Sequence, residues 1–180
     1  ILSGGKFSPH SNKWDREGAK IFKRFEKKMG SDAPLGIYGF RNSGLLKIDL
    51  EGMWELSLRV DHTDEVPAGT NWQKIWVPRY WEDQGHRFDG FALYRKQIFI
   101  NADLSRESLM LMLGMIDDQD RVYVNGVLVG QTGFGSFEKG HPTHNSWCHS
   151  IQRAYIIPPG TLKPNQSNEI LLEVYDQGGA

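Results

Sequence analysis

The densest group of acidic side chains in this 180-residue sequence is Asp117, Asp118 and Asp120, which directly follow the apolar run 109–116. Together with backbone carbonyls, such carboxylates supply the oxygen ligands that Ca²⁺ requires. The D-D-x-D pattern lacks the glycine and the distal glutamate of a dedicated calcium loop. We therefore expect these aspartates to accept hydrogen bonds from backbone N–H groups and nearby arginines. Calcium binding is the alternative, and no other cofactor is predicted.

A second set of candidate metal ligands lies in the segment 141–149, which reads HPTHNSWCH. His141, His144, His149 and Cys148 carry the nitrogen and sulfur donors that zinc prefers, but their spacing matches no familiar zinc motif. We interpret the segment as a loop that crosses one end of the fold. Cys148 is the single cysteine of the chain, so an internal disulfide is excluded.

The sequence shows no arrangement typical of a catalytic site. Ser3, Ser43 and Ser136 lie in glycine-containing stretches, but none forms the G-x-S-x-G turn of a serine hydrolase. Glycoside hydrolysis needs two carboxylates roughly 5–10 Å apart across a sugar-sized cleft, a distance that spacing along the chain does not determine. We predict that this domain is not an enzyme by itself.

Aromatic and charged side chains are concentrated in the segment 79–84, which reads RYWEDQ. A sugar site needs aromatic faces against the apolar side of a pyranose ring, and charged or amide groups for its hydroxyls. Two aromatic residues of the long irregular segment 131–149 are expected to join this loop. The predicted ligand-binding residues are Arg79, Tyr80, Trp81, Asp83, Phe134 and Trp147. The alternative for Trp81 is a place in the hydrophobic core, where aromatic clusters are more often found.

The composition excludes several classes of partner. With 21 Lys and Arg against 22 Asp and Glu, the formal net charge of −1 gives no basic footprint for nucleic acid. No apolar run approaches the roughly 20 residues of a membrane-spanning helix. The first residues do not resemble a signal peptide.

The segment 12–29 is predicted to form an amphipathic helix, with apolar residues recurring on one face and lysines and arginines on the other. An asparagine at its start is a suitable N-cap, and Gly30 stops it. We expect the helix to dock across a β core, with a basic membrane-surface helix as the alternative. The chain is therefore divided into an N-terminal arm with this helix, residues 1–34, and a β domain, residues 35–180.

The β domain is organised around the apolar run 109–116, which is too short to span a membrane and has no helix caps. We predict that it is a strand buried on both faces. Residues 121–125 then alternate between polar and apolar, and Asn125-Gly126 supplies the two positive-φ residues of a type I′ turn. About eight strands separated by turns predict an all-β fold, an antiparallel two-sheet jelly-roll β-sandwich with one N-terminal amphipathic helix.

Across residues 45–180 the sequence carries a series of short motifs in a fixed order. They are LEGMW at 50–54, WVP at 76–78, WEDQG at 81–85, DGFALYR at 89–95, LGMIDDQD at 113–120, VYVNG at 122–126, RAYIIP at 153–158 and EILLEVYD at 169–176. This series resembles the galactose-binding-like jelly-roll domain, which is the sugar-binding domain of family 2 glycoside hydrolases and also occurs in sialate O-acetylesterases.

The resemblance implies that the chain is a module of a larger protein. This module does not carry the catalytic acid and nucleophile. We expect a non-catalytic carbohydrate-binding or ligand-sensing module of a bacterial protein, located outside the cytoplasm in the periplasm or at the cell surface. One alternative is the sugar-binding domain of a family 2 glycosidase or an O-acetylesterase, where it contributes to the substrate cleft. Another is a structural or dimerisation domain of a signalling protein. The expected partners are a carbohydrate or small-molecule ligand, an attached catalytic or signalling domain and a second copy of the chain, but not nucleic acid.

Overall fold

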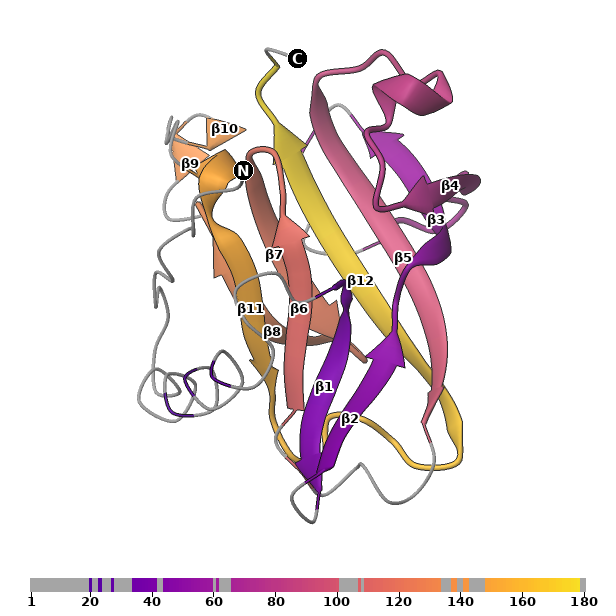
Figure 1. The fold of residues 1–180 in the computed structure, drawn as a ribbon. Coiled ribbons are helices and arrows are strands. Elements are labelled where there is room, and N and C mark those ends of the chain that lie inside the picture. Colours follow the sequence, from indigo (N-terminus) through magenta and orange to yellow (C-terminus); the bar gives the residue numbers. More distant parts are fainter. Residues whose placement is uncertain are drawn as a thin grey trace.

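The computed structural model shows an all-β fold built on two antiparallel sheets (Figure 1). It describes residues 34–41, 44–59, 61, 66–100, 107, 109–133, 137–138, 141–142 and 148–178, together with Lys20, Lys23 and Lys27. The all-β class and the two-sheet arrangement predicted from the sequence are confirmed. Within the described ranges, no helix is long and apolar enough to cross a membrane.

The smaller of the two main sheets has four strands and the larger has six. The four-stranded sheet has the order β11-β6-β1-β2, with β1 Gly36–Arg41, β2 Gly44–Asp49, β6 Leu109–Met115 and β11 Gln152–Ile157. The six-stranded sheet has the order β4-β3-β5-β12-β7-β8, with β3 Gly52–Arg59, β4 Gln73–Val77, β5 Gly90–Ile100, β7 Gln119–Val124, β8 Val127–Thr132 and β12 Gln166–Asp176. Short elements complete the fold, namely β9 Phe137–Glu138, β10 His141–Pro142 and the 3₁₀ helices η1 Glu82–Gln84 and η3 Cys148–Ser150.

The hydrophobic core lies between the two sheets, because side chains from both meet there. Ile37 of β1 and Leu111 of β6 face Leu56 of β3, Val122 of β7 and Ile170 of β12 within one cluster, and each is at most 1% exposed. Burying a side chain of this size contributes roughly 1.5–3 kcal/mol. The alternation along each strand therefore fixes which face of each sheet points inward.

Strand β6 is buried on both faces, as predicted from its unbroken apolar sequence. Leu109, Leu111 and Leu113 belong to the core cluster, while Met110 and Met112 on the opposite face are also buried. Both edges of the strand are paired as well, one with β1 and the other with β11. A strand surrounded in this way has no position for a polar side chain, which explains the sequence.

The hairpin after β6 belongs to the other sheet. Strands β7 and β8 pair through a turn in which Asn125 has φ 50° and Gly126 has φ 78°, so the predicted positive-φ turn is confirmed. The Asn125 side chain anchors the turn, since its Nδ2 donates to the Thr161 carbonyl at 2.8 Å and its Oδ1 accepts from the Glu169 N–H at 3.0 Å. The residues between β6 and β7, Ile116 to Asp118, therefore carry the chain from one sheet to the other.

The predicted N-terminal helix falls almost entirely outside the described residues. Of the segment 12–29, the structure describes Lys20, Lys23 and Lys27, which have helical backbone conformation and are exposed. The apolar face on which the prediction depended is not among them. The amphipathic helix therefore remains a prediction.

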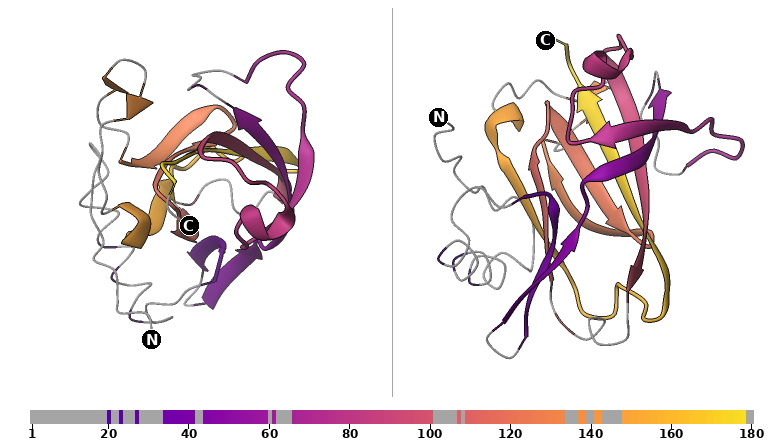
Figure 2. Two further views of the ribbon diagram at one scale, coloured as in Figure 1. Left: turned by 90° about the horizontal axis from the view of Figure 1, so that it is seen from above. Right: turned by 45° about the vertical axis from the view of Figure 1, so that its right-hand side comes forward.

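One end of the sandwich carries the longest fully described connection between strands, the segment 78–89 from β4 to β5. The 3₁₀ helix η1 lies in this segment. In Figure 1 and in the right-hand view of Figure 2, η1 lies at the same end of the sandwich as the end of β12. This is the end at which the chain also crosses from β6 to β7.

Candidate functional site

A pocket of about 390 Å³ opens at this end, and both sheets contribute to it. The four-stranded sheet provides Leu113 and Met115 of β6, and the six-stranded sheet provides Tyr94 of β5 together with Leu172 and Val174 of β12. The connection from β4 to β5 forms another wall. The remaining lining residues are Leu35, Trp54, Val77, Pro78, Arg79, Tyr80, Trp81, Glu82, Ile116, Asp117 and Asp176. Aliphatic and aromatic walls with a few polar groups are typical of small-molecule sites.

The side chain of Gln84 holds the wall segment against the edge strand β4. Its Oε1 accepts from the Trp76 N–H at 2.7 Å, and its Nε2 donates to the carbonyls of Trp76 at 3.0 Å and Tyr80 at 3.1 Å. The amide thus satisfies strand-edge groups that would otherwise face solvent. Gly85, with φ 91°, ends η1 in a left-handed conformation that suits glycine. These contacts position Tyr80 and Trp81 at the pocket.

Trp81 is both a core residue and a pocket wall. Only 5% of it is exposed, and it belongs to the hydrophobic core cluster. Its ring stacks on Tyr94, with ring centres 6.4 Å apart and planes inclined by 6°, and meets the edge of Phe88 at 6.4 Å. The ring is therefore fixed in place whether or not a ligand is present.

Tyr80 and Arg79 stand at the surface of the same wall. Tyr80 is 68% exposed, so its aromatic ring is accessible from solvent. The guanidinium carbon of Arg79 lies 5.8 Å from the centre of the Trp76 ring, within cation–π range. Three of the predicted ligand residues, Arg79, Tyr80 and Trp81, therefore meet at one pocket.

The other three predicted ligand residues are placed differently. Asp83 is exposed on η1 and does not line the pocket. Phe134 and Trp147 lie outside the described residues. Their contribution to ligand binding stays a prediction.

Three carboxyl groups line the pocket, from Glu82, Asp117 and Asp176. Partial burial, a hydrogen bond with Asp118 and the negative charges of Asp118 and Asp176 raise the pKa of Asp117 to about 6, against a weaker opposing effect of His149. Partial burial also raises the pKa of Asp176, together with nearby negative charges that include Glu82. The pocket therefore holds carboxyl groups that lack full compensation by positive charge.

Burial also raises the pKa of Tyr94, so its phenol stays protonated in the pocket. A protonated phenol can donate a hydrogen bond to a ligand oxygen. Sequence reasoning marked the segment that contains Glu82 but did not include Glu82 among the ligand residues, and it did not identify Tyr94 or Asp176. The place of Tyr94 and Asp176 at the pocket depends on strand pairing over long distances, and no local motif marks it.

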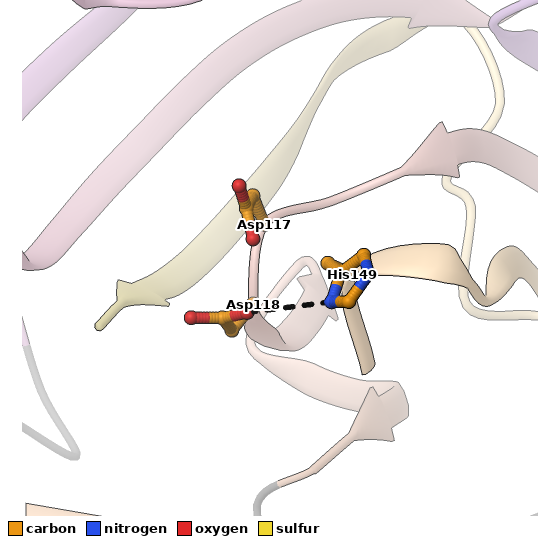
Figure 3. A group of neighbouring side chains, drawn as sticks. All are labelled: Asp117, Asp118 and His149. Atoms are coloured by element: carbon orange, nitrogen blue, oxygen red, sulfur yellow. Dashed lines mark ion pairs between the residues drawn. The ribbon is translucent and has the colours of Figure 1, made fainter. Parts of the chain in front are cut away.

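Asp117, Asp118 and His149 form a compact group beside the pocket (Figure 3). One ligand atom from each lies within 4.8 Å of the others, and His149 Nδ1 is 4.0 Å from Asp118 Oδ1. Asp118 Oδ2 accepts the Gln177 N–H at 3.1 Å, in agreement with the predicted role as a backbone acceptor. Three donors are fewer than the about six to eight oxygens that Ca²⁺ takes, so we do not assign a metal here.

Asp120, the third aspartate of the predicted calcium group, differs from the other two in its hydrogen-bond partners. It is fully buried, and its Oδ1 accepts from Arg153 Nε at 2.6 Å while its Oδ2 accepts from the Tyr155 hydroxyl at 2.6 Å. The prediction that arginine pairs with this cluster is met at Asp120. Burial raises its pKa, whereas the charge of Arg153 and the hydrogen bonds from Arg153 and Tyr155 oppose the rise.

Arg153 uses its remaining N–H groups to bind three carbonyls around this carboxylate. Nη1 donates to the carbonyls of Cys148 and Ile151, and Nη2 donates to the carbonyl of Asp118 at 2.7 Å. The fully buried guanidinium therefore ties η3 and β11 to the crossing from β6 to β7. A buried charge with this many partners is a structural element, since each partner offsets the loss of hydration.

The histidine- and cysteine-containing segment 141–149 is only partly described. Cys148 is buried, and burial raises the pKa of its thiol, which keeps it protonated and unreactive. His149 is exposed in η3, while His144 lies outside the described residues. The structure groups His149 with aspartates rather than with Cys148.

No protein-family model matches the chain, and no curated protein sequence matches it. Several solved structures do match its fold. A β-glucuronidase from Ruminococcus gnavus in complex with D-glucuronic acid superposes with a TM-score of 0.54 at 18% identity, over 71% of this chain and 21% of the enzyme. Faecalibacterium prausnitzii β-glucuronidase superposes with a TM-score of 0.55 at 21% identity, over 77% of this chain and 22% of the enzyme.

The match thus spans about a fifth of each β-glucuronidase. At these identities the similarity concerns the arrangement of the chain. The sequence-based resemblance to the sandwich domain of family 2 glycoside hydrolases is confirmed at that level. The chain has the β-sandwich fold of a domain-sized part of bacterial β-glucuronidases.

Proposed function

We propose that this chain is a non-catalytic carbohydrate-binding domain of a larger protein, and that it binds its ligand in the pocket between the two sheets. The observation that carries the proposal is the composition of that pocket. Aromatic rings and aliphatic side chains line a space of about 390 Å³, and carboxyl and phenol groups converge on it. Sugars require this combination, because their rings have apolar faces and their hydroxyls need hydrogen-bond partners.

Tyr80 is the residue with which to test the proposal, because it is accessible and adjoins the pocket. Tyr80→Ala removes a ring that is 68% exposed, so the folded state loses little packing. If the ring contacts the sugar, its loss should weaken binding about tenfold or more. Isothermal titration with mono- and oligosaccharides measures the change, and thermal melting shows whether the fold is intact.

Phe99 provides the matched control. It is also 68% exposed, but it lies near the end of β5 and does not line the pocket. Phe99→Ala should leave sugar affinity unchanged. Equal affinities for the wild type and both variants would refute the placement of the site, and the absence of heat with every sugar would refute carbohydrate binding.

A second candidate is favoured by the identity of the matched structures, which are enzymes. The domain would then contribute to the substrate cleft of a glycoside hydrolase rather than bind sugar alone. The short share of each β-glucuronidase that is matched supports an accessory role in either case. Binding by this domain in isolation supports the first candidate. An effect of Tyr80→Ala on the KM of the whole protein, without binding by the isolated domain, supports the second.

The location outside the cytoplasm, the sensing role and the homodimer stay parts of this proposal that follow from the sequence resemblance. Reporter fusions on either side of the cytoplasmic membrane would test the location. Sedimentation equilibrium would test the homodimer.

A further inference from the structure

The pocket carries more negative than positive charge. Three of its lining residues are acidic, whereas Arg79 is the single basic residue among them. The guanidinium of Arg79 lies over the ring of Trp76, which does not line the pocket. Two further carboxylates outside the lining, Asp89 and Asp118, add negative charge next to Asp176.

Within the described part of the chain, neither of the two aspartates in the pocket is paired with a lysine or arginine. The ion pairs of the described residues involve other carboxylates. Asp176 accepts one hydrogen bond, from the Gly178 N–H at 2.7 Å. Asp117 faces Asp118, Asp176 and the imidazole of His149. Asp117 is exposed and Asp176 is half-buried, so water can hydrate both carboxyl groups.

A ligand that enters the pocket removes some of this water. For a neutral sugar, the lost hydration of the carboxylates opposes binding, although hydroxyl hydrogen bonds offset part of it. For an acidic sugar, like-charge repulsion is added. For a sugar with a protonated amine, a charge-assisted hydrogen bond replaces the water.

From this charge distribution we propose that the pocket selects a sugar that carries a protonated amine over the neutral sugar, and that it rejects the corresponding uronic acid. The inference rests on the proposed carbohydrate-binding function and specifies the class of ligand. It also separates this pocket from a site for glucuronic acid, the molecule bound in one of the matched enzymes.

Isothermal titration with glucosamine, glucose and glucuronic acid, at equal ionic strength and at pH 7, where Asp117 is mostly ionised, tests the order of affinities. A charge-assisted hydrogen bond should make glucosamine at least about tenfold tighter than glucose. Glucuronic acid should bind more weakly than glucose. Added salt should reduce the preference for glucosamine, because the charges are partly exposed.

Variants locate the preference in the pocket. Asp117→Asn and Asp176→Asn each remove one of the negative charges, so each should reduce the ratio of glucosamine affinity to glucose affinity several-fold. Asp61→Asn is the matched control, because it makes the same charge change at an exposed position outside the pocket. It should retain the full preference.

The possible failures differ in what they overturn. Equal binding of all three sugars, or tightest binding of glucuronic acid, overturns the charge preference and leaves the proposed function standing. If cyclohexylamine binds as tightly as glucosamine and glucose does not bind, the pocket recognises an amine rather than a sugar. This result overturns both the carbohydrate-binding function and the proposal that the ligand is an amino sugar. An unchanged preference in both pocket variants overturns the assignment to Asp117 and Asp176. No binding of any probe overturns both proposals.

Discussion

Asp117 and Asp120 lie three positions apart around the crossing from β6 to β7, yet their carboxyl groups have opposite surroundings. Asp120 is fully enclosed, and each of its oxygens accepts a hydrogen bond of 2.6 Å, one from Arg153 and one from Tyr155. Asp117 is largely exposed at the rim of the pocket and faces other carboxyl groups. One segment thus supplies an acid whose two oxygens both have hydrogen-bond partners and an acid that faces other carboxyl groups.

The difference teaches which acids hold the structure and which are available to a ligand. A carboxylate that leaves water completely is stable only if charge and hydrogen bonds replace its hydration. Asp120 meets that condition and has no capacity left for a ligand. Asp117 keeps its capacity because it stays at the surface, where partial burial and the negative charges of Asp118 and Asp176 raise its pKa.

Of the variants that test this comparison, removal of Arg153 should lower the free energy of unfolding the most. Arg153→Met leaves a buried carboxylate without its cation, which typically costs about 3–5 kcal/mol of the free energy of unfolding. Urea denaturation measures the loss. The double variant with Asp120→Asn should recover part of it, because no uncompensated charge remains.

Lys74 provides the control for Arg153. It forms an exposed ion pair with Glu55 at 3.1 Å, and pairs of this kind contribute about 1 kcal/mol or less. Lys74→Met should therefore change stability much less than Arg153→Met. Similar losses in both variants would show that enclosure of the Arg153–Asp120 pair adds nothing.

The hydroxyl of Tyr155 should matter less than the guanidinium. Tyr155→Phe removes the donor to Asp120 Oδ2 and the hydrogen bond of 2.7 Å with the Thr132 hydroxyl. A buried acceptor without its partner costs about 1–3 kcal/mol. Thermal unfolding of Tyr155→Phe and of the exposed control Tyr80→Phe compares the two hydroxyls, and equal melting temperatures would contradict the structural role of Tyr155.

Local patterns in the sequence were sufficient to predict the elements on both sides of the crossing from β6 to β7. Strand β6 was predicted because a short apolar run without caps suits a strand enclosed on every side. The turn at Asn125-Gly126 was predicted because few residue pairs adopt positive φ twice. Both features depend on residues that are neighbours in the chain.

The two acidic environments depend on residues that are distant in the chain, and local patterns do not determine them. The Tyr155 ring reaches the carboxylate of Asp120 across Gly130, where a Cβ atom would overlap the ring. Asp176 reaches the pocket because β12 pairs with both β5 and β7. The aromatic loop at Tyr80 was found from its composition, but the acids opposite it require the register of the whole sheet.

The smallest effect on stability is expected at Asp117, and it depends on pH. The pKa of Asp117 is about 6 in the folded protein, above its ordinary value of 3.8, so the folded state favours the protonated form. The stabilisation from this group is fully present below pH 4 and is lost as the pH rises through 6. Because the carboxyl group is largely exposed, solvent screening reduces the loss to the order of 1 kcal/mol.

Asp117→Asn should therefore be more stable than the wild type by about 1 kcal/mol at pH 7 and equal to it at pH 4, since asparagine resembles the protonated acid. Urea denaturation at the two pH values measures the difference. Asp83→Asn, with the same charge change at an exposed site outside the pocket, should alter stability by less than about 0.5 kcal/mol at both. A constant difference for Asp117→Asn across this range would mean that water compensates Asp117 as fully as Arg153 compensates Asp120, and the contrast between the two acids would disappear.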